Sequence, residues 1–539
     1  MCNFIPMSIM KEKLAHLGVW FVYLIVLFAG LFFITRNNLG DTLNLVPGDL
    51  GDARFNSYII EHAYKYFAGT TESYWNAPFM VPETEVISYS DNLLGMLPFY
   101  AAFRLINYDV LTSFQCMFIV LVILNYSTCF LFLKWLFKNY YAAAVGAFVF
   151  AFNISLQSQM THAQTFGRFA APLTFMFLLK FSEDRKLKNL FLSFLSFVWQ
   201  LYCGIYLGLL LFIPYATTLL AISFNNKKLI PIDVYRKYGL PKIFLCFLVP
   251  FLSILPLFVP YIRRSSNVPL SGYRGIVDTI PVFKSFLYAQ HGSYFWEFLS
   301  ESGSKLPAFW DHQLFPGAIA LLSLLVTFFL IKPWRIFNSE EIRESDNSSM
   351  IYLSLAAFIT FSCFIRVDKF SMYWLIHYLP AFGSMRSMTR IINIELLFFA
   401  IATSFVFVII TKKIKINSLV LFMVFLPLLI LDNYVDRNFT YHTAKDIANE
   451  RVQVLGNKLS ALPKGSLFSY EPDSIMQNPI EFQLDAMLAA QAFDLKCVNG
   501  YTATSPPEYT EFWNKLDAAS REKWFNTQSF HPSNLHLIH

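Results

Sequence analysis

Long apolar runs alternate with short polar segments over the first four-fifths of the chain. A helix needs about 20 apolar residues to cross the hydrocarbon core of a bilayer, and runs of this kind, some of them shorter, occur about eleven times. They cover Gly18–Thr35, Thr112–Leu136, Ala142–Ile154, Pro172–Phe181, Leu190–Cys203, Ile205–Phe224, Ile243–Tyr261, Leu314–Ile331, Ile351–Ile365, Ile391–Thr411 and Ser418–Leu431. The pattern predicts an α-helical polytopic membrane protein, with about eleven transmembrane helices in a domain of residues 1–433.

The pattern changes after residue 433, where no further spanning run follows. Helical periodicity over Ala444–Leu462 precedes a strand-like Ser466–Tyr470. A second helical segment, Phe482–Phe493, precedes the strand-like Leu495–Val498. Helices that alternate with short strands are typical of a small α/β fold. We therefore expect a soluble C-terminal α/β domain over residues 434–539.

Composition and charge support the membrane assignment and exclude some partners. Hydrophobic residues make up 55% of the chain and charged residues 14%, whereas soluble domains carry roughly 25% charged residues. The net charge of +6 indicates no nucleic-acid partner, because the basic residues are dispersed among short loops. No Cys or His spacing typical of a metal site is present, and there is no glycine-rich nucleotide loop.

The distribution of Lys and Arg predicts the orientation, because cytoplasmic loops are enriched in both. Basic residues gather at alternate loops, for example Lys134 and Lys138, Arg185 to Lys188, and Lys412 to Lys415. This places the N-terminus in the cytoplasm and the C-terminal domain on the extracytoplasmic side.

The first external loop, residues 36–110, carries an acidic segment directly outside the first spanning run. Gly48–Asn56 contains Asp49 and Asp52, and ionisable groups at a bilayer boundary often have a function. Asp52 begins a predicted amphipathic helix that ends at about Phe67 and lies along the membrane interface. It either caps this helix or takes part in chemistry. Leu93–Ile106 is predicted to form a second interfacial helix.

Three further external segments carry polar side chains. They are Gln157–Arg168, the loop of residues 262–313, and Pro380–Arg390, which leads into a late spanning helix. The candidate basic residues Arg168, Arg386 and Arg390 would bind either a phosphate or lipid headgroups.

These residues suit the transfer of a sugar from a lipid-linked phosphate. A carboxylate accepts the proton of the acceptor hydroxyl, and cationic groups stabilise the departing phosphate. The candidate catalytic residues are Asp49 and Asp52. The candidate substrate-binding residues are Arg54, Glu61, Asp91, His162, Arg168, Arg386 and Arg390. For three of these a structural role competes: Glu61 as the i,i+4 partner of Lys65, Asp91 as a cap of the second interfacial helix, and His162 as a satisfied interfacial histidine.

A polytopic chain with an acidic motif and two interfacial helices in its first external loop resembles the GT-C superfamily of glycosyltransferases. That superfamily includes protein mannosyltransferases, aminoarabinose transferases and oligosaccharyltransferases. Pro380–Arg390 and Asp311–Gly317 resemble segments of bacterial members, including YfhO-like proteins. The spacing Asp49-x-x-Asp52 departs from the adjacent Asp-Asp, Glu-Asp or Asp-x-Asp of the superfamily.

The resemblance implies a glycosyltransferase of the bacterial inner membrane that uses a first-loop acid as its base. Its donor would be a polyprenyl-phosphate sugar, transferred by a single inverting displacement to a glycan, lipid or protein acceptor. No cofactor is certain, and a divalent metal is possible.

Two other classes remain open. A lipid-linked glycan polymerase or ligase would depend more on Arg263, Arg264 and Arg274. A transporter or flippase of a lipid-linked glycan would need ionisable groups near the membrane midplane, and the predicted helix centres contain almost none.

Overall fold

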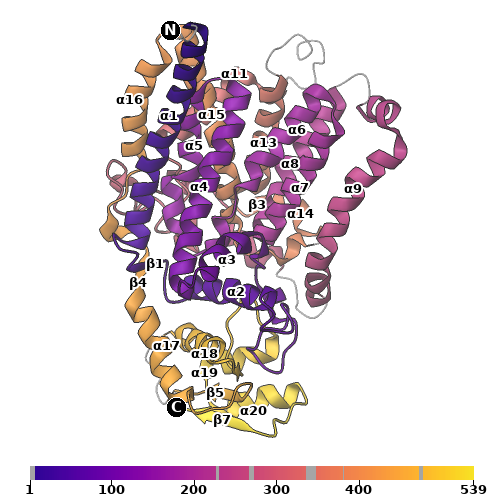
Figure 1. The fold of residues 1–539 in the computed structure, drawn as a ribbon, viewed down its shortest axis with the longest axis vertical. Coiled ribbons are helices and arrows are strands. Elements are labelled where there is room, and N and C mark those ends of the chain that lie inside the picture. Colours follow the sequence, from indigo (N-terminus) through magenta and orange to yellow (C-terminus); the bar gives the residue numbers. More distant parts are fainter. Residues whose placement is uncertain (1–6, 226–229, 266–271, 335–347, 380, 473–477) are drawn as a thin grey trace, which may run out of the picture.

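The computed structural model describes residues 7–225, 230–265, 272–334, 348–379, 381–472 and 478–539. An assembly of long, roughly parallel helices lies above a smaller α/β unit in Figure 1, and two short helices lie between them. The chain is therefore a polytopic helical membrane protein with a small α/β unit at one end of its helices.

Each of the eleven predicted apolar runs lies on a helix. In chain order these helices are α1 (Met7–Leu39), α4 (Val110–Phe137), α5 (Tyr140–Ala151), α6 (Ala170–Asp184), α7 (Leu187–Cys203), α8 (Ile205–Asn225), α9 (Ile230–Ser265), α11 (Ala318–Ile331), α13 (Ser348–Phe364), α15 (Ile392–Ile414) and α16 (Ser418–Asn433).

Fewer helices reach spanning length than the eleven that the sequence predicts. Within the described residues, six helical segments are long and apolar enough to cross a membrane, and four shorter apolar helices accompany them. The helix α6, for example, has 15 residues and extends about 22 Å at 1.5 Å per residue. That length is below the roughly 30 Å of a hydrocarbon core. Apolar composition alone does not reveal where a helix ends, so it overestimates the number of spanning helices.

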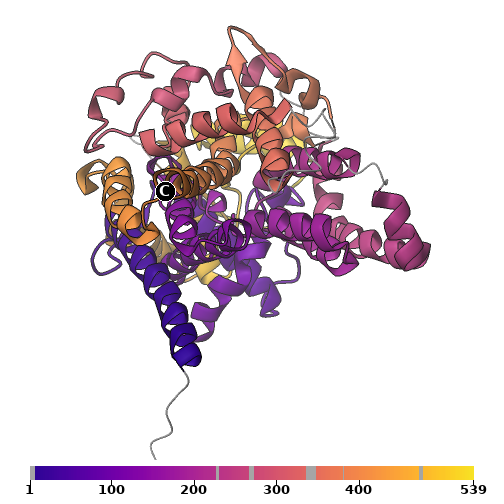
Figure 2. The same cartoon turned by 90° about the horizontal axis from the view of Figure 1, so that it is seen from above.

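The helix assembly has a tightly packed centre and a loosely packed edge. Its helices α5 and α15 approach closely, since a Cβ on Gly146 would lie 2.6 Å from the carbonyl oxygen of Ala400. Ser404 also donates a hydrogen bond to the carbonyl of Ala142. Small residues allow such contacts between membrane helices. By contrast, α1 and α9 lie at separate edges of the assembly (Figure 2) and expose most of their apolar side chains.

The first loop contributes β1 (Leu45–Pro47), α2 (Asp52–Phe67), the short 3-10 helices η1 (Val86–Tyr89) and η2 (Leu94–Met96), and α3 (Leu97–Leu105). The helices α2 and α3 lie across the lower ends of the long helices in Figure 1. The prediction of two helices that lie along the interface is confirmed in position. Every residue of α2 from Ala53 to Ala63 is buried. The C-terminal unit and α3 therefore cover polar side chains that the amphipathic pattern left without a partner.

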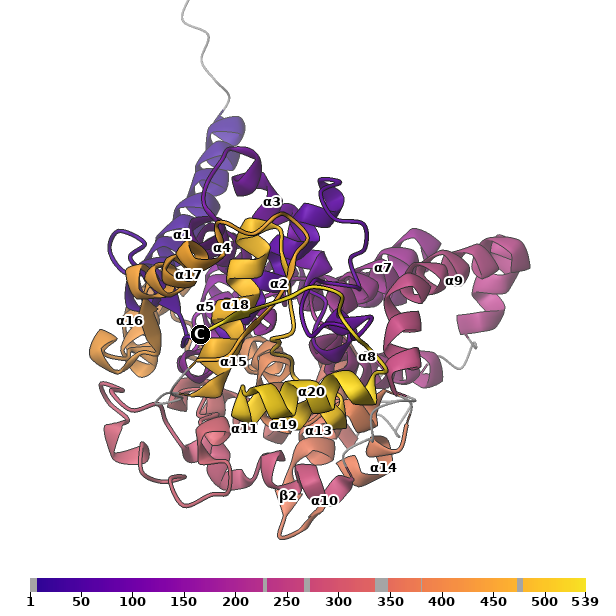
Figure 3. The ribbon, with the colours of Figure 1, turned by 90° about the horizontal axis from the view of Figure 1, so that it is seen from below.

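The C-terminal unit follows α16 and consists of α17 (Lys445–Leu459), β5 (Leu467–Tyr470), α18 (Pro479–Phe493), β6 (Lys496–Cys497), α19 (Thr510–Lys515), α20 (Ala518–Thr527) and β7 (Leu535–Ile538). Its three strands form a parallel sheet in the order β6-β5-β7. Seen from below, the unit extends across the ends of the long helices (Figure 3). The four elements that the sequence predicts for this region agree with α17, β5, α18 and β6.

Short elements complete the lower face of the assembly. They are α10 (Tyr273–Ile276), the hairpin of β2 (Arg366–Val367) and β3 (Phe370–Ser371), α14 (Tyr373–His377), and β4 (His442–Ala444), which pairs antiparallel with β1. The β1–β4 pair joins the segment after the first long helix to the segment after the last one.

Candidate active site

The acidic segment is held against the loop that contains His162. Gly48 has a φ of +91°, and a Cβ at this position would lie 2.7 Å from the Cα of Thr161. Its amide donates a hydrogen bond of 3.0 Å to the carbonyl of Tyr441, next to the β1–β4 pair. Only glycine combines this backbone conformation with so close an approach. The sequence Gly48–Asp49 therefore places the first-loop acids beside Thr161 and His162.

Asp52 is the first residue of α2, but it does not cap the helix. The N-cap is Gly51, and no side chain caps it. The Asp52 carboxylate instead accepts a hydrogen bond of 2.5 Å from the hydroxyl of Tyr501. Its other oxygen lies 2.9 Å from His162 Nδ1. The capping interpretation of Asp52 is thus wrong.

These neighbours decide the charge of Asp52. Burial by itself raises the pKa of the carboxyl, but His162, the Tyr501 hydroxyl and the positive charge of Arg390 outweigh burial and lower the pKa to about 2. Asp52 is therefore ionised throughout the neutral range.

Asp49 is in the opposite situation. Burial, followed by the negative charge of Asp52, raises its pKa. One of its oxygens accepts a hydrogen bond of 3.0 Å from the amide of Gly51, and within the described residues it forms no ion pair. A half-buried carboxylate with a raised pKa and no cationic partner is well suited to accept a proton.

Arg386 and Arg390 add unpaired positive charge to the same group. Within the described part of the chain, neither guanidinium takes part in an ion pair or a hydrogen bond. Burial and repulsion by Arg390 lower the pKa of Arg386. The Arg390 guanidinium lies over the Tyr206 ring, 5.1 Å from its centroid, and its charge acts on both Asp52 and Asp91. Both arginines therefore act electrostatically on Asp52, and neither is paired with an anion in the part of the chain that the structure describes.

Asp91 belongs to this group, although it caps a different helix from the one expected. Its carboxylate accepts a hydrogen bond of 3.3 Å from the amide of Tyr206, in the first turn of α8. Burial raises its pKa, while the charge of Arg390 acts in the opposite direction. The second interfacial helix takes no cap from it, since η2 begins after Leu93 without a side-chain cap.

Arg168 lies apart from the acids and is fully buried. Its guanidinium donates hydrogen bonds to the carbonyl of Phe150 (2.7 Å), the carbonyl of Thr165 (3.3 Å) and the side chain of Asn393 (3.0 Å). Burial lowers its pKa to about 9. Arg168 thus joins the loop before α6 to the beginning of α15.

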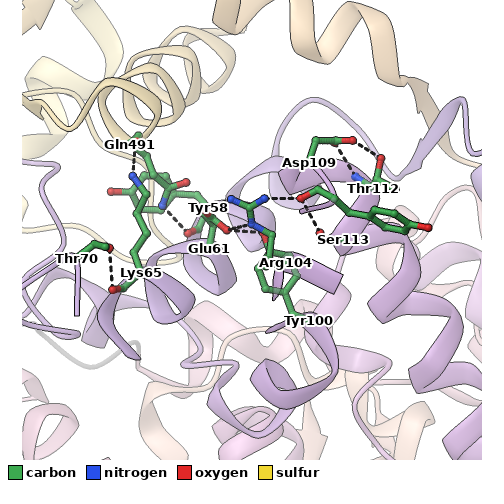
Figure 4. Close-up of polar contacts among 11 residues, drawn as sticks. Tyr58, Glu61, Lys65, Thr70, Tyr100, Arg104, Asp109, Thr112, Ser113 and Gln491 are labelled. Carbon is green, nitrogen blue, oxygen red and sulfur yellow. Dashed lines mark hydrogen bonds and ion pairs between the residues drawn. The ribbon is translucent and has the colours of Figure 1, made fainter. Parts of the chain in front are cut away.

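Glu61 and Arg54 are also paired within the protein. Glu61 accepts hydrogen bonds from Tyr100 (2.7 Å) and from two nitrogens of Arg104 (2.9 and 3.0 Å), as Figure 4 shows. The alternative i,i+4 partner, Lys65, instead binds Asp494 at 2.9 Å. Arg54 is buried in an ion pair with Asp485 of the C-terminal unit. Both residues hold α2 in place, which the helix pattern did not indicate.

The structure adds Tyr206 and Tyr501 to the group. Tyr206 follows the break at Gly204 between α7 and α8, and Tyr501 follows Asn499-Gly500, a turn signal. Turns are typical places for functional side chains. A single tyrosine that belongs to no recognisable motif, however, gives no direct indication of its role.

Pro380, the first residue of the late-loop segment, lies outside the described residues. In the part that the structure describes, no group of three or more His, Cys, Asp or Glu side chains is arranged to hold a metal ion. A divalent ion at Asp49 and Asp52 would take its remaining oxygen ligands from a substrate phosphate and water.

Comparisons with known proteins give little further information. No model of a protein family matches the chain, and no curated protein is similar to it. Among solved structures, the chain is similar to the archaeal oligosaccharyltransferase AglB from Archaeoglobus fulgidus, in complex with an inhibitory peptide and a dolichol-phosphate. The match has 9% identity and a TM-score of 0.47, and it covers 94% of this chain and 68% of AglB.

Proposed function

We propose that the protein is a membrane glycosyltransferase of GT-C type that transfers a sugar from a polyprenyl-phosphate-linked donor to an extracytoplasmic acceptor. The site would face outward from a bacterial inner membrane, on the side that carries the C-terminal unit. The domain division at residue 433 and the relation to YfhO-like proteins stay predictions.

One observation supports this proposal above the others. Arg386 and Arg390 have no anionic partner within the described residues, yet both interact electrostatically with Asp52, the neighbour of Asp49 in the acidic segment. Arginine side chains readily form bidentate hydrogen bonds with phosphate. If the two arginines bind the phosphate of the donor, the sugar carbon bonded to that phosphate lies close to a carboxylate that can accept a proton.

The opposite pKa directions suggest a division of roles. Asp49 accepts the proton of the acceptor hydroxyl as that oxygen attacks the anomeric carbon. The bond between this carbon and the phosphate oxygen breaks, and Arg386 and Arg390 stabilise the negative charge of the departing phosphate. Asp52 stays ionised and supports the positive charge that develops on the sugar ring. A single displacement of this kind inverts the anomeric configuration.

The polymerase or ligase alternative gains less support from two of its three arginines, while the third, Arg274, is exposed. Arg263 pairs with Glu85 at 2.7 Å, and Arg264 lies 3.6 Å from Glu83 and over the ring of Tyr89. Charges that are already paired are poorly placed to bind a lipid-linked phosphate.

The test compares envelope glycans and glycolipids of the source cell, by mass spectrometry, with and without the gene. Loss of the gene should remove one sugar, and the wild-type gene should restore it. Asp49→Asn should lower restoration by about 10²- to 10⁴-fold, as expected for loss of a general base. Arg390→Ala should lower it by about 10²-fold.

The matched control is Glu522→Gln, which changes an exposed carboxylate of α20 in the same way. It should restore the sugar fully at equal protein levels. Full restoration by both Asp49→Asn and Asp52→Asn would contradict the proposed site.

A further inference from the structure

The C-terminal unit reaches Asp52 through the side chain of Tyr501. Tyr501 lies 449 positions from Asp52 in the sequence, yet its hydroxyl donates the 2.5 Å hydrogen bond to that carboxylate. Its ring makes edge contacts with Phe55 of α2 (5.3 Å between centroids) and with Trp513 of α19 (5.6 Å). Because the ring is held from both sides, the position of the hydroxyl is fixed.

The segment before Tyr501 is fastened to the first loop through its backbone. The amide of Met80 donates to the carbonyl of Asn499 (3.0 Å), and that of Cys497 donates to the carbonyl of Pro78 (3.1 Å). A Cβ on Gly500 would lie 2.9 Å from the Cβ of Met80, so the close approach requires glycine. These contacts fix Tyr501 relative to α2.

The segment after Tyr501 is fastened in the same way. The amide of Ala503 donates to the hydroxyl of Ser90 (2.7 Å), and the amide of Thr504 donates to the carbonyl of Tyr89 (3.2 Å). Both partners directly precede Asp91. The C-terminal unit is therefore docked against the two first-loop segments that carry site aspartates.

We propose that Tyr501 is a positioning residue for the reaction: the C-terminal unit supplies the hydroxyl that holds the Asp52 carboxylate in its working orientation. This inference rests on the proposed function for its catalytic meaning, but the contact itself can be tested without any substrate. Docking of the C-terminal unit thereby becomes a condition for a complete site.

Several other groups act on the same carboxylate. The titratable and charged groups that face it or interact with it are His162, Tyr501, Arg390, Asp49 and Arg386. Removing the Tyr501 hydroxyl withdraws one favourable hydrogen bond from the charged form and leaves the other four groups in place. The pKa of Asp52 then rises.

The substrate-free experiment measures this rise directly. The full-length purified protein is treated with a water-soluble carbodiimide and an amine between pH 1.5 and 6, and modification at Asp52 is quantified by mass spectrometry. The carboxyl couples to this reagent in its protonated form, so wild-type Asp52, with a pKa of about 2, should react little above pH 3. In Tyr501→Phe, the midpoint of modification should rise by about one pH unit, the scale of one hydrogen bond to a charged group.

The matched control is Tyr509→Phe in the same unit. The Tyr509 hydroxyl is buried and donates to the carbonyl of Val498 (2.9 Å), away from Asp52. This variant loses a hydroxyl with comparable burial and should leave the Asp52 midpoint unchanged. Equal midpoints in Tyr501→Phe and the wild type would overturn the inference, as would an equal rise in Tyr509→Phe.

The second measurement concerns transfer. Tyr501→Phe should lower restoration of the sugar by about 10-fold. It should also move the acid limb of the pH dependence of transfer to higher pH. Tyr509→Phe should change neither beyond its effect on protein level. A raised Asp52 midpoint with unchanged transfer would refute the positioning role while leaving the contact established. If cells without the gene keep all their sugars, the proposed function is wrong, but the contact between Tyr501 and Asp52 is unaffected.

Discussion

Two carboxylates three positions apart acquire different chemistry because their surroundings differ. Asp52 meets a histidine, a phenol and the field of an arginine, so its pKa falls, whereas Asp49 meets burial and a neighbouring negative charge, so its pKa rises. Pairs of acids whose pKa values are moved apart often divide the roles of proton acceptor and fixed charge. The second and fifth positions of Gly48-Asp49-Leu50-Gly51-Asp52 are both aspartate, so the sequence does not indicate this division.

The lowered pKa of Asp52 predicts how stability depends on pH. The group has a pKa of about 2 in the folded state against 3.8 as its ordinary value, so its contribution is complete above about pH 4 and disappears as the pH falls towards 2. The contribution is on the order of 2 kcal/mol. Asp52→Asn should therefore lower the Tm of the detergent-solubilised protein equally at pH 7 and pH 5, and less at pH 3.

Thermal unfolding of both proteins at these three pH values checks this expectation. A difference in Tm that persists unchanged at pH 3 would show that the charge of Asp52 is not the cause.

At the scale of elements, the spacing of apolar and polar residues predicted helix positions well and helix surroundings poorly. The helix predicted to begin at Asp52 and end at about Phe67 does so. Its two faces carry different side chains, with Phe55 and Ile59 on one and Arg54 and Glu61 on the other. In the structure both faces are buried, because α18 supplies Asp485 and α3 supplies Arg104 as partners. Local periodicity contains no information about such distant partners.

The close approach at Gly48 predicts a sensitive position. Gly48→Ala would place a methyl group 2.7 Å from the Cα of Thr161, so the acidic segment and the loop with His162 must separate. We expect a loss of stability of about 2–4 kcal/mol and loss of transfer at normal expression, measured by thermal unfolding and by glycan restoration.

Gly69→Ala provides the control for backbone strain. Gly69 also has a positive φ, +74°, but no atom lies within 4 Å of its Cβ position. Its replacement should cost only about 1 kcal/mol and leave transfer intact. Equal effects of the two substitutions would mean that strain, and not the contact with Thr161, determines the result.

At the scale of the molecule, the site gathers residues from segments that are distant in the chain. Asp49 and Asp52 come from the first loop, His162 from the second, Arg386 and Arg390 from a late loop, and Tyr501 from the C-terminal unit. The sequence predicted most members of this group from their polar character beside apolar runs. It could not predict which would meet, so Arg54, Glu61 and Arg168 were included although their hydrogen bonds and ion pairs are made within the protein.

Asp485 joins the C-terminal unit to α2. We expect this residue to contribute much of the stability of the contact between them. It pairs with the buried Arg54 and, at 2.7 Å, with Arg451. Asp485→Asn would leave a buried guanidinium without its counter-charge, at a cost of about 3–5 kcal/mol. We expect faster cleavage of the C-terminal unit in limited proteolysis, together with loss of transfer.

Glu511→Gln in the same unit is the control. Glu511 pairs with Lys515 and Lys523 at the surface, where ion pairs contribute little, so its cleavage rate should match the wild type. Unchanged cleavage of Asp485→Asn would show that this ion pair does not hold the unit in place.

The pairing of β1 with β4 has a consequence for biosynthesis. Leu45 lies opposite Ala444, so a segment made soon after the first helix waits for a partner that leaves the ribosome some four hundred residues later. Contacts of such long sequence separation form late and slowly. A chain released before Tyr501 is translated would hold every basic residue of the site and both first-loop acids, but would lack the hydroxyl that donates to Asp52. The proposed site is thus completed only after most of the chain has been made, because β1 and Asp52 both await partners from its last hundred residues.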